Sequence, residues 1–117
     1  MEVNERPNAE TPFVLIAKLR VKPDQVEEYL KIAQKADDAV RHSEPGMLLH
    51  TFDASPDDPC SFTWTEVYQN DVALIAHFNN PLLQPYLTEH DRLADSAINV
   101  TIYGNLAKET VQFLNQS

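Results

Sequence analysis

Glycine is scarce in this chain: only two of its 117 residues are glycine, Gly46 and Gly104. Flavin and nicotinamide cofactors are commonly held by a glycine-rich turn between a strand and a helix, where several glycines let the backbone approach the phosphates. Two isolated glycines cannot build such a turn or a phosphate-binding loop. We therefore exclude a Rossmann-type cofactor site and expect no bound cofactor.

Cysteine and basic residues are also few. The single cysteine, Cys60, excludes an intramolecular disulfide and a cysteine-based metal cluster. No two of the four histidines stand at a spacing typical of metal ligands, so we expect no metal site, and we expect His42 and His90 at the surface. Nine lysines and arginines against eighteen aspartates and glutamates give a net charge of −9, which argues against nucleic acid and anionic membranes as partners.

Targeting signals and long apolar segments are missing from the sequence as well. The first residues lack the basic and apolar regions of a signal peptide, and no apolar run reaches the length of a membrane span. We therefore expect a cytoplasmic protein. A hydrophobic content of 43% suffices for one modest core, and the polar start predicts a flexible arm over residues 1–11 and a single domain over residues 12–117.

What is present is a clear succession of strand and helix patterns. Apolar residues repeat at helical spacing over residues 23–42, where the predicted buried stripe consists of Val26, Tyr29, Leu30, Ala33, Ala36 and Val40. Two further helices are predicted for residues 71–78 and 82–96, and strands for residues 13–21, 47–53, 61–69 and 98–104. The remaining residues, 105–117, are expected to form a C-terminal extension.

This order, β-α-β-β-α-β, predicts an α+β fold of the ferredoxin-like type, with a four-stranded antiparallel sheet and both helices on one face. The other face of that sheet would then have no helix over it. That face carries Val14 and Ile16 on the first strand and Val67 on the third, which are apolar enough to need cover. We therefore predict that a second copy of the chain packs there, in a homodimer.

The third predicted strand and the helix after it carry the most informative residues. A strand alternates its side chains between two faces, so Trp64, Glu66 and Tyr68 point the same way. On the following helix His77 and Phe78 share a face. If this helix folds back over its strand, an imidazole, a carboxylate and a phenol converge beneath an apolar cover. The result is either a small active site or a satisfied polar pair within the core.

His77 and Glu66 are the candidate catalytic residues. With an unperturbed pKa of about 6.5, a histidine can act as a base or as a hydrogen-bond donor at neutral pH. The alternative is a structural role, in which Glu66 or a backbone carbonyl fixes His77 between helix and sheet. The candidate substrate-binding residues share a ring that can pack against a flat substrate: Trp64, Tyr68, His50 and Phe78.

In these segments the chain resembles the antibiotic biosynthesis monooxygenase (ABM) domain family. The landmarks are Gly46 at the start of the second strand, Glu66 and Tyr68 near the end of the third, and the Ala76-His77 pair followed by Asn-Asn-Pro. The resemblance covers most of the chain. It implies a ferredoxin-like monomer that pairs as a dimeric α/β barrel and binds a small molecule.

The resemblance implies a choice among several chemistries, because the family includes cofactor-free monooxygenases and quinol oxidases, haem-degrading enzymes and an isomerase of phosphorylated autoinducer-2. Haem-degrading members use an Asn on the first strand, a Trp at the end of the third strand and a His on the later helix. The matching positions here are Ala17, Tyr68 and Leu87. These residues argue against haem degradation.

The leading hypothesis is a cofactor-independent monooxygenase acting on a small electron-rich aromatic, such as a quinol or a polyketide-like phenol. A deprotonated substrate of this kind passes an electron to oxygen itself, so the protein needs only a dry pocket, a base and donors that stabilise the anion. One alternative is an isomerase of a small phosphorylated or sugar-like ketone, for which Lys18, Arg20 and Arg92 are the available cations. The other alternative is a dimeric small-molecule binder without catalysis.

Overall fold

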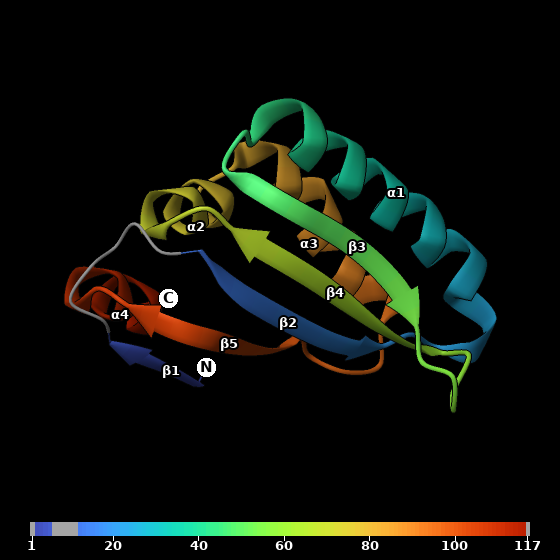
Figure 1. Cartoon of the computed structure of the whole chain (residues 1–117). Coiled ribbons are helices and arrows are strands. Elements are labelled where there is room, and N and C mark those ends of the chain that lie inside the picture. The colour runs from blue at the N-terminus through green and yellow to red at the C-terminus, as the bar shows by residue number, and fades with distance from the viewer. Residues whose placement is uncertain (1, 6–11, 117) are drawn as a thin grey trace.

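A mixed sheet forms the centre of the molecule in the computed structural model, which describes residues 2–5 and 12–116. The sheet has five strands in the order β1-β5-β2-β4-β3 (Figure 1). These strands are β1 (Glu2–Glu5), β2 (Phe13–Arg20), β3 (Met47–Ala54), β4 (Ser61–Tyr68) and β5 (Asn99–Leu106). The neighbours among β2 to β5 are antiparallel, whereas β1 pairs in parallel with β5.

Three helices lie against one face of this sheet, behind it in Figure 1: α1 (Val26–Ser43), α2 (Asp71–Phe78) and α3 (Gln84–Leu93). The short 3-10 helices η1 (Pro23–Gln25) and η2 (Pro81–Leu83) lead into α1 and α3. A last helix, α4 (Lys108–Asn115), follows β5 and lies near β1. The predicted ferredoxin-like α+β fold is confirmed.

Two elements extend the predicted arrangement. The strand β1 lies within the segment expected to be a flexible arm, which corrects that expectation for Glu2–Glu5 and gives the sheet a fifth strand. Residues 1 and 6–11 of the expected arm lie outside the described residues. The helix α4 lies within the expected C-terminal extension and buries Thr110 and Leu114, so this segment is part of the folded domain.

The helix α1 buries four of the six residues of its predicted apolar stripe, and Val26 is partly buried. Tyr29, Ala33, Ala36 and Val40 are buried, at spacings that keep them on one face of the helix. Leu30 is 46% exposed, so its predicted burial is wrong. It lies about 100° around the helix from Tyr29, whose larger ring takes the position facing the sheet.

The helix α2 begins at Asp71, as the sequence predicts, and Asn70 caps it. The side-chain oxygen of Asn70 accepts the backbone N–H of Ala73 at 3.0 Å, which caps the helix. Asp71 is buried, and its Oδ2 accepts the backbone N–H of Ala107 at 2.9 Å. This bond ties the start of α2 to the junction of β5 and α4, and so fixes the helix that carries His77.

Both glycines permit close contacts in the packing. A Cβ on Gly46 would lie 2.6 Å from the Cβ of Ala73, so only glycine lets the start of β3 approach α2 this closely. Gly104 has a φ of +149°, and a Cβ there would lie 2.6 Å from the Cβ of Phe13. The two glycines therefore serve strand and helix packing.

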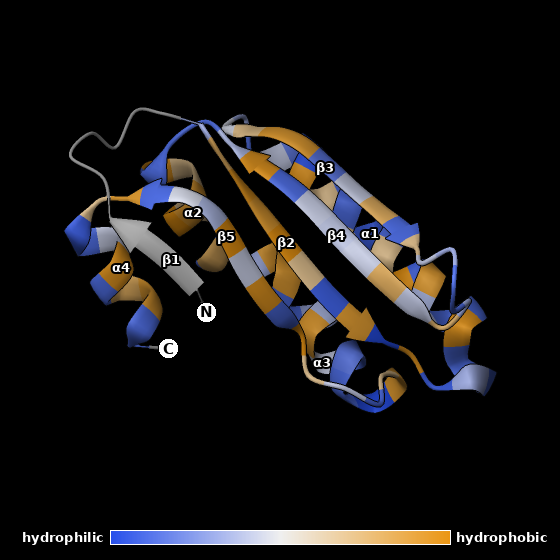
Figure 2. Ribbon diagram, turned by 60° about the horizontal axis from the view of Figure 1, so that its bottom comes forward, coloured by the Kyte–Doolittle hydropathy of each residue, from blue (hydrophilic) through white to orange (hydrophobic). Residues whose placement is uncertain are grey.

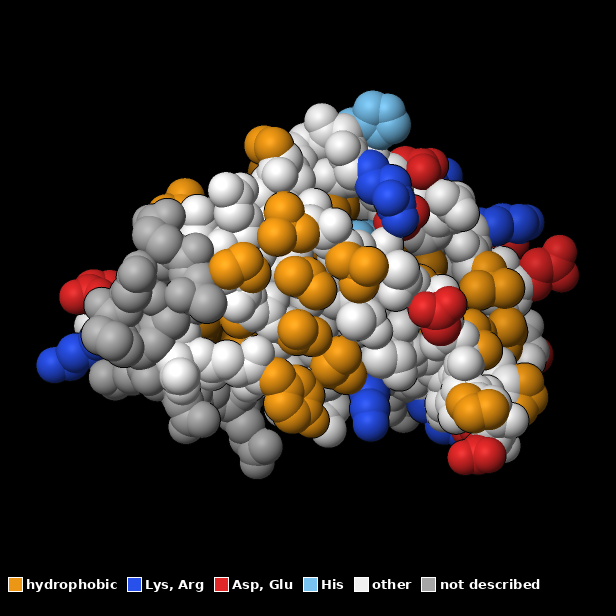
Figure 3. All heavy atoms as spheres, viewed as in Figure 1, with side chains coloured by type: hydrophobic (Ala, Val, Ile, Leu, Met, Phe, Trp, Pro, Cys, Tyr) orange, Lys and Arg blue, Asp and Glu red, His pale blue; other side chains and the backbone are white. Residues whose placement is uncertain are grey.

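The two faces of the sheet differ in cover. The face beneath the helices is buried, and Figure 2 shows the apolar run of β2 at the middle of the sheet. The opposite face, which we call the open face, carries a row of apolar residues paired from strand to strand: Leu49, Val67, Val14 and Tyr103. Leu49 is 44% and Tyr103 is 64% exposed, and apolar side chains gather over the middle of this face in Figure 3. The second copy of the chain, which is expected to pack on this face, stays a prediction.

Candidate functional site

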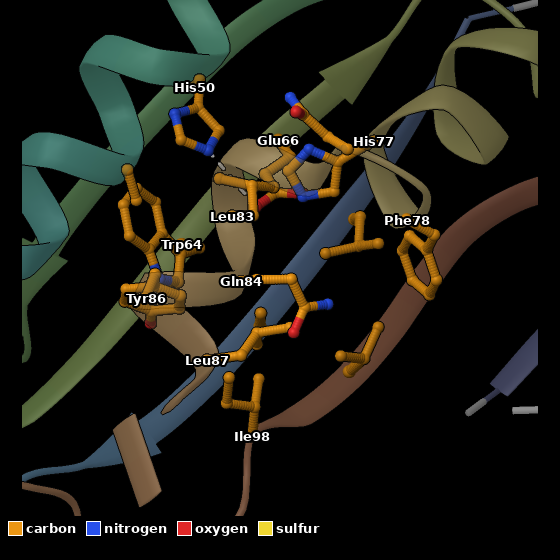
Figure 4. A pocket seen from close by; sticks show the side chains of 15 residues that line it. His50, Trp64, Glu66, His77, Phe78, Leu83, Gln84, Tyr86, Leu87 and Ile98 are labelled. Carbon is orange, nitrogen blue, oxygen red and sulfur yellow. Dashed lines mark hydrogen bonds and ion pairs between the residues drawn. The ribbon is translucent and has the colours of Figure 1, made fainter. Parts of the chain in front are cut away.

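A cavity of about 230 Å³ lies between the sheet and the helices. Its walls come from β2 to β5 and from α1, α2, η2 and α3, and most of the lining is apolar or aromatic. The carboxylate, amide and imidazole groups that reach it belong to His50, Glu66, His77, Asn80 and Gln84. Figure 4 shows His50 and His77 approaching Glu66 from two sides. We call this space the helix-side cavity.

Glu66 lies at the centre of the polar wall. The alternation of β4 turns Trp64, Glu66 and Tyr68 toward the helices, as predicted, and Glu66 is only 5% exposed. The Tyr68 hydroxyl donates a hydrogen bond to Glu66 Oε1. The Nε2 atom of His50 lies 3.5 Å from Glu66 Oε2, and the Nε2 atom of His77 lies 3.8 Å from Oε1. One buried carboxylate thus faces two imidazoles and a phenol.

His50 is held at both ring nitrogens. It pairs with Glu66 across the ladder of β3 and β4, which turns Nε2 toward that carboxylate. Its Nδ1 lies 2.7 Å from Asp37 Oδ1, and its ring stacks on Trp64 with 4.6 Å between the centroids. Arg41 donates to Asp37 at 2.9 Å and to the carbonyl of His50 at 2.8 Å. The orientation of this imidazole is therefore fixed.

His77 reaches the same wall from α2 with a different anchor. Its Nδ1 lies 2.9 and 3.1 Å from the two carboxylate oxygens of Glu44, just beyond the end of α1. Asn80 holds this carboxylate in place, because its amide donates to Glu44 at 2.8 Å and to Ser43 at 3.0 Å. The expectation of a direct hydrogen bond between His77 and Glu66 is wrong, because the 3.8 Å between Nε2 and Oε1 is too long for one.

The charges of this wall shift the pKa values of its members. Burial alone would raise the pKa of Glu66, but the hydrogen bond from His50 and the charge of His77 outweigh burial and lower it. Burial alone would lower the pKa of His50, but hydrogen bonds to Glu66 and Asp37 outweigh burial and raise it. Burial would also raise the pKa of Asp37, which Arg41 and His50 lower instead. Both carboxylates stay ionised, and His50 is shifted toward the imidazolium form.

The hydrogen-bond partners assign the protons of the two imidazoles. An ionised carboxylate only accepts, so a ring nitrogen bonded to one carries a proton. His50 faces Asp37 with Nδ1 and Glu66 with Nε2, which suits an imidazolium. His77 donates from Nδ1 to Glu44, which in the neutral ring leaves Nε2 unprotonated beside the cavity. The wall therefore combines an imidazole held between two carboxylates with one whose Nε2 atom faces the cavity.

The structure brings most of the predicted site residues together. The helix-side cavity is lined by Trp64, Glu66, His77, His50 and Phe78. Tyr68 does not line it: its ring is fully buried and stacks on Phe13, with 5.5 Å between the centroids. Burial and the charge of Glu66 raise the pKa of Tyr68, so it keeps its proton. Tyr68 thus supports the carboxylate of Glu66 from behind.

Two acids on or beside α1 are missing from the sequence-based site. Asp37 and Glu44 are seven residues apart, with Arg41 between them, so they follow one side of the helix. They border the buried positions Ala36 and Val40. A carboxylate at the margin of a buried stripe needs a partner, and this spacing is the signal that could have pointed to them.

A second hydrogen-bonded chain leaves the cavity at Tyr86. Trp64 Nε1 donates to the Tyr86 hydroxyl at 2.9 Å, and the hydroxyls of Tyr86 and Tyr29 are bonded to each other. The Tyr29 hydroxyl lies 2.7 Å from His90 Nδ1, and His90 Nε2 lies 3.0 Å from the carbonyl oxygen of Ser96. His90 is only 4% exposed, so its predicted surface position is wrong. It follows Tyr86 by one turn on the buried side of α3.

Residues 2–5 and 12–116 contain no group of three or more His, Cys, Asp or Glu residues arranged to hold a metal ion. None of the helices in this part of the chain is both long enough and apolar enough to cross a membrane. Cys60 is a free thiol and does not line the helix-side cavity.

The sequence matches a known protein family over most of the folded domain. Residues 12–87 match the family described as antibiotic biosynthesis monooxygenase. An uncharacterized protein of Synechocystis sp. is 30% identical over 95 residues, which cover 81% of this chain and 64% of that protein. The chain thus spans less than two thirds of this relative's length.

Solved structures of other bacterial proteins share the fold. A candidate antibiotic biosynthesis monooxygenase from Caulobacter crescentus gives a TM-score of 0.77 at 19% identity, covering 80% of this chain and 89% of that one. A protein of the same description from Nitrosomonas europaea gives a TM-score of 0.73 at 22% identity, covering 88% of this chain and 97% of that one. At such identities the likeness establishes the fold alone.

Proposed function

Because the chain belongs to the antibiotic biosynthesis monooxygenase family, we propose that it is a cofactor-independent monooxygenase. Its substrate is a small electron-rich aromatic, such as a quinol or a polyketide-like phenol. The polar wall of the helix-side cavity carries this proposal, because it places two imidazoles with different hydrogen-bond partners beside a mostly apolar space. The volume of about 230 Å³ suits one or two fused rings, since pockets for drug-sized ligands measure about 300–1,000 Å³.

In this proposal His77 removes the phenolic proton of the substrate through its free Nε2. Deprotonation turns the ring into an electron donor, which passes one electron to dioxygen. The phenoxyl and superoxide radicals then combine at a ring carbon, and the peroxide anion takes back the proton from His77 to give a hydroperoxide. Loss of water from the hydroperoxide leaves a quinone, so phenol and oxygen yield quinone and water in equal amounts.

In this proposal His50 stabilises the negative charge that forms on the substrate and on oxygen, and Glu66 positions the two imidazoles. The imidazolium of His50, fixed by Asp37, places a positive charge where the phenolate and the superoxide form. A charge held in a dry site stabilises an anion more than the same charge in water does. Glu66 sets the spacing of the two imidazoles, and Trp64 offers a flat surface to the substrate ring.

Oxygen uptake tests the proposal. Purified protein without added cofactor is given a panel of hydroquinones and polycyclic phenols in an oxygen electrode, and quinone formation is followed by absorbance. We expect uptake of one O₂ per quinone with at least one member of the panel. Heat-denatured protein and added superoxide dismutase control for autoxidation of the quinols. Uptake no faster than these controls across the panel contradicts the proposed activity.

We also propose that the chain works as a homodimer through its open face. The row that includes Leu49, Val67 and Tyr103 is apolar and partly exposed, and a second sheet packed across it removes this surface from water. Val67→Asp places a charge in the middle of the row. Sedimentation equilibrium should give twice the chain mass of 13.3 kDa for the wild type and the single mass for the variant. A monomeric wild type contradicts the dimer.

The two alternatives receive less support. An isomerase of a phosphorylated ketone needs cations at the cavity, but the lining contains no lysine or arginine among the described residues. Arg20 pairs instead with Asp58, and Arg92 pairs with Glu89. A binder without catalysis would be favoured by a filled core, whereas an open cavity lined by His77 and Tyr68 would count against it. The cavity is open and His77 lines it, but Tyr68 does not, so this criterion is met only in part.

A further inference from the structure

The chain of hydrogen bonds behind the cavity has a defined direction. A backbone carbonyl only accepts, so His90 Nε2 carries a proton and donates it to the carbonyl of Ser96. In the neutral ring, His90 Nδ1 then accepts from the Tyr29 hydroxyl. The oxygen of Tyr29 accepts from the Tyr86 hydroxyl, whose own oxygen accepts from Trp64 Nε1. In each hydrogen bond between Trp64 and His90, the donor is therefore the group nearer to Trp64.

The hydrogen-bonded chain contains three rings that can be oxidised: Trp64, Tyr86 and Tyr29. Among these three, Tyr29 is the ring whose proton has a base to accept it. Trp64 and Tyr86 donate to phenol oxygens, which are weak bases, whereas Tyr29 donates to an imidazole nitrogen. Burial raises the pKa of Tyr29, so its phenol stays protonated at rest. Removal of an electron makes a phenol strongly acidic, and its proton must then have somewhere to go. An oxidised ring is therefore most stable at Tyr29.

The same chain connects Tyr29 to the helix-side cavity. Trp64 and Tyr86 line the cavity and lie close together in Figure 4, whereas Tyr29 is fully buried behind them. The ring centroids of Trp64 and Tyr86 are 5.8 Å apart, and those of Tyr86 and Tyr29 are also 5.8 Å apart. Such short steps between aromatic rings let an electron pass from Tyr29 to an oxidant in the cavity without direct contact.

We propose that Tyr29 is a redox-active tyrosine that reduces radicals formed in the cavity, with His90 as its proton acceptor. The oxidant is the hydroperoxyl radical, HO₂•: a phenolate substrate passes one electron to oxygen without recombining, and the superoxide formed takes the proton that His77 removed from the phenol; this source rests on the proposed function. Tyr29 gives one electron to HO₂•, and its phenolic proton moves to His90 Nδ1. With one proton from solvent, HO₂• becomes hydrogen peroxide, leaving a Tyr29 phenoxyl radical and a His90 imidazolium.

Flash photo-oxidation tests this site without any substrate. A ruthenium(III) tris-bipyridine oxidant is generated by a light flash with persulfate, and the frozen sample is examined by electron paramagnetic resonance. All samples carry Tyr103→Phe, because Tyr103 lies on the open face, is 64% exposed in the single chain and would add a tyrosyl signal of its own. We expect a tyrosyl signal in this background and its loss when Tyr29→Phe is added. Because no turnover is involved, this result is independent of the monooxygenase activity.

Two further variants make the test specific. Tyr68→Phe is the matched control, since it removes a buried tyrosine bonded to a carboxylate instead of an imidazole, and it should keep the signal. His90→Gln supplies an oxygen that accepts the Tyr29 hydroxyl but is not basic, so the radical yield should fall while the circular dichroism is unchanged. This variant also decides the question if Tyr29→Phe does not fold.

Four outcomes overturn the proposal. They are the absence of a tyrosyl signal in the Tyr103→Phe background, its survival in Tyr29→Phe, its loss in Tyr68→Phe, and an unchanged yield in His90→Gln.

Discussion

Trp64 and Glu66 lie two residues apart on one face of β4, yet they lead into networks of opposite character. Glu66 belongs to a charged network, in which two imidazoles are held by three carboxylates at the open part of the cavity. Trp64 begins a neutral network of two phenols and one imidazole that runs back into the core. Both use histidine, but the partners decide what each histidine can do.

One strand can therefore serve two kinds of chemistry. Carboxylates around an imidazole favour its protonated form, as the raised pKa of His50 shows. At His90 the partners are a phenol and a backbone carbonyl. The donor and acceptor roles in these two hydrogen bonds fix which ring nitrogen carries the proton. The charged network is suited to moving the protons of a ligand, and the neutral one to holding aromatic rings in line.

Removal of the central charge should give the largest effect on stability. Glu66→Leu leaves the His50 imidazolium with one carboxylate partner and the Tyr68 hydroxyl without its acceptor. Breaking a buried charge pair in this way typically costs about 3–5 kcal/mol. The free energy of unfolding in urea measures the loss. Glu66→Gln keeps an accepting oxygen and should cost less, so equal losses for the two variants would contradict the charged network.

A change in the neutral network should cost less. Tyr86→Phe leaves Trp64 Nε1–H without an acceptor and the Tyr29 oxygen without its donor. An unsatisfied buried polar group costs about 1–3 kcal/mol, and urea unfolding again measures it. Tyr103→Phe removes a hydroxyl on the open face, outside both networks, and should stay within about 0.5 kcal/mol of the wild type. If Tyr86→Phe costs as much as Glu66→Leu, the contrast between the networks fails.

The pH dependence of stability should show the smallest effect. The pKa of His50 is raised on folding, so its contribution is complete below the ordinary value of 6.5 and is lost as pH rises through the folded value. The pKa of Glu66 is lowered, so its contribution is present above the ordinary value of 4.5 and is lost as pH falls through the folded value. Stability should decline on both sides, and His50→Gln should weaken the alkaline decline.

Urea midpoints at mildly acidic and at alkaline pH measure this change. The matched control is His42→Gln, which alters an exposed histidine on α1 away from the cavity. The wild type and this control should lose stability alike as pH rises. If His42→Gln weakens the alkaline decline as much as His50→Gln does, the decline does not come from the charged network.

Local pattern was enough to predict one side of the site. Strand alternation placed Trp64 and Glu66 on the helix side of β4, because period two is a property of any strand. The predicted bounds of α2, residues 71–78, agree with the structure. These features depend on residues close together in the sequence.

The rest of the site depends on contacts between distant residues. Glu44, which anchors His77, lies 33 residues before it, and their meeting depends on how the end of α1 packs on α2. His90 meets Tyr29, which lies 61 residues earlier. No local pattern distinguishes such a histidine from one at the surface. The pairing of β1 with β5 joins the two ends of the chain and is equally invisible to local periodicity.

The central claim is that His77 acts as the base at the charged wall. The most direct measurement is kcat for the best quinol of the panel, from oxygen uptake by the wild type, His77→Gln and the matched control His42→Gln. General-base catalysis contributes about 10²–10⁴-fold to a rate, so His77→Gln should lose that much of kcat while His42→Gln keeps the wild-type value. Wild-type turnover by His77→Gln would contradict the account.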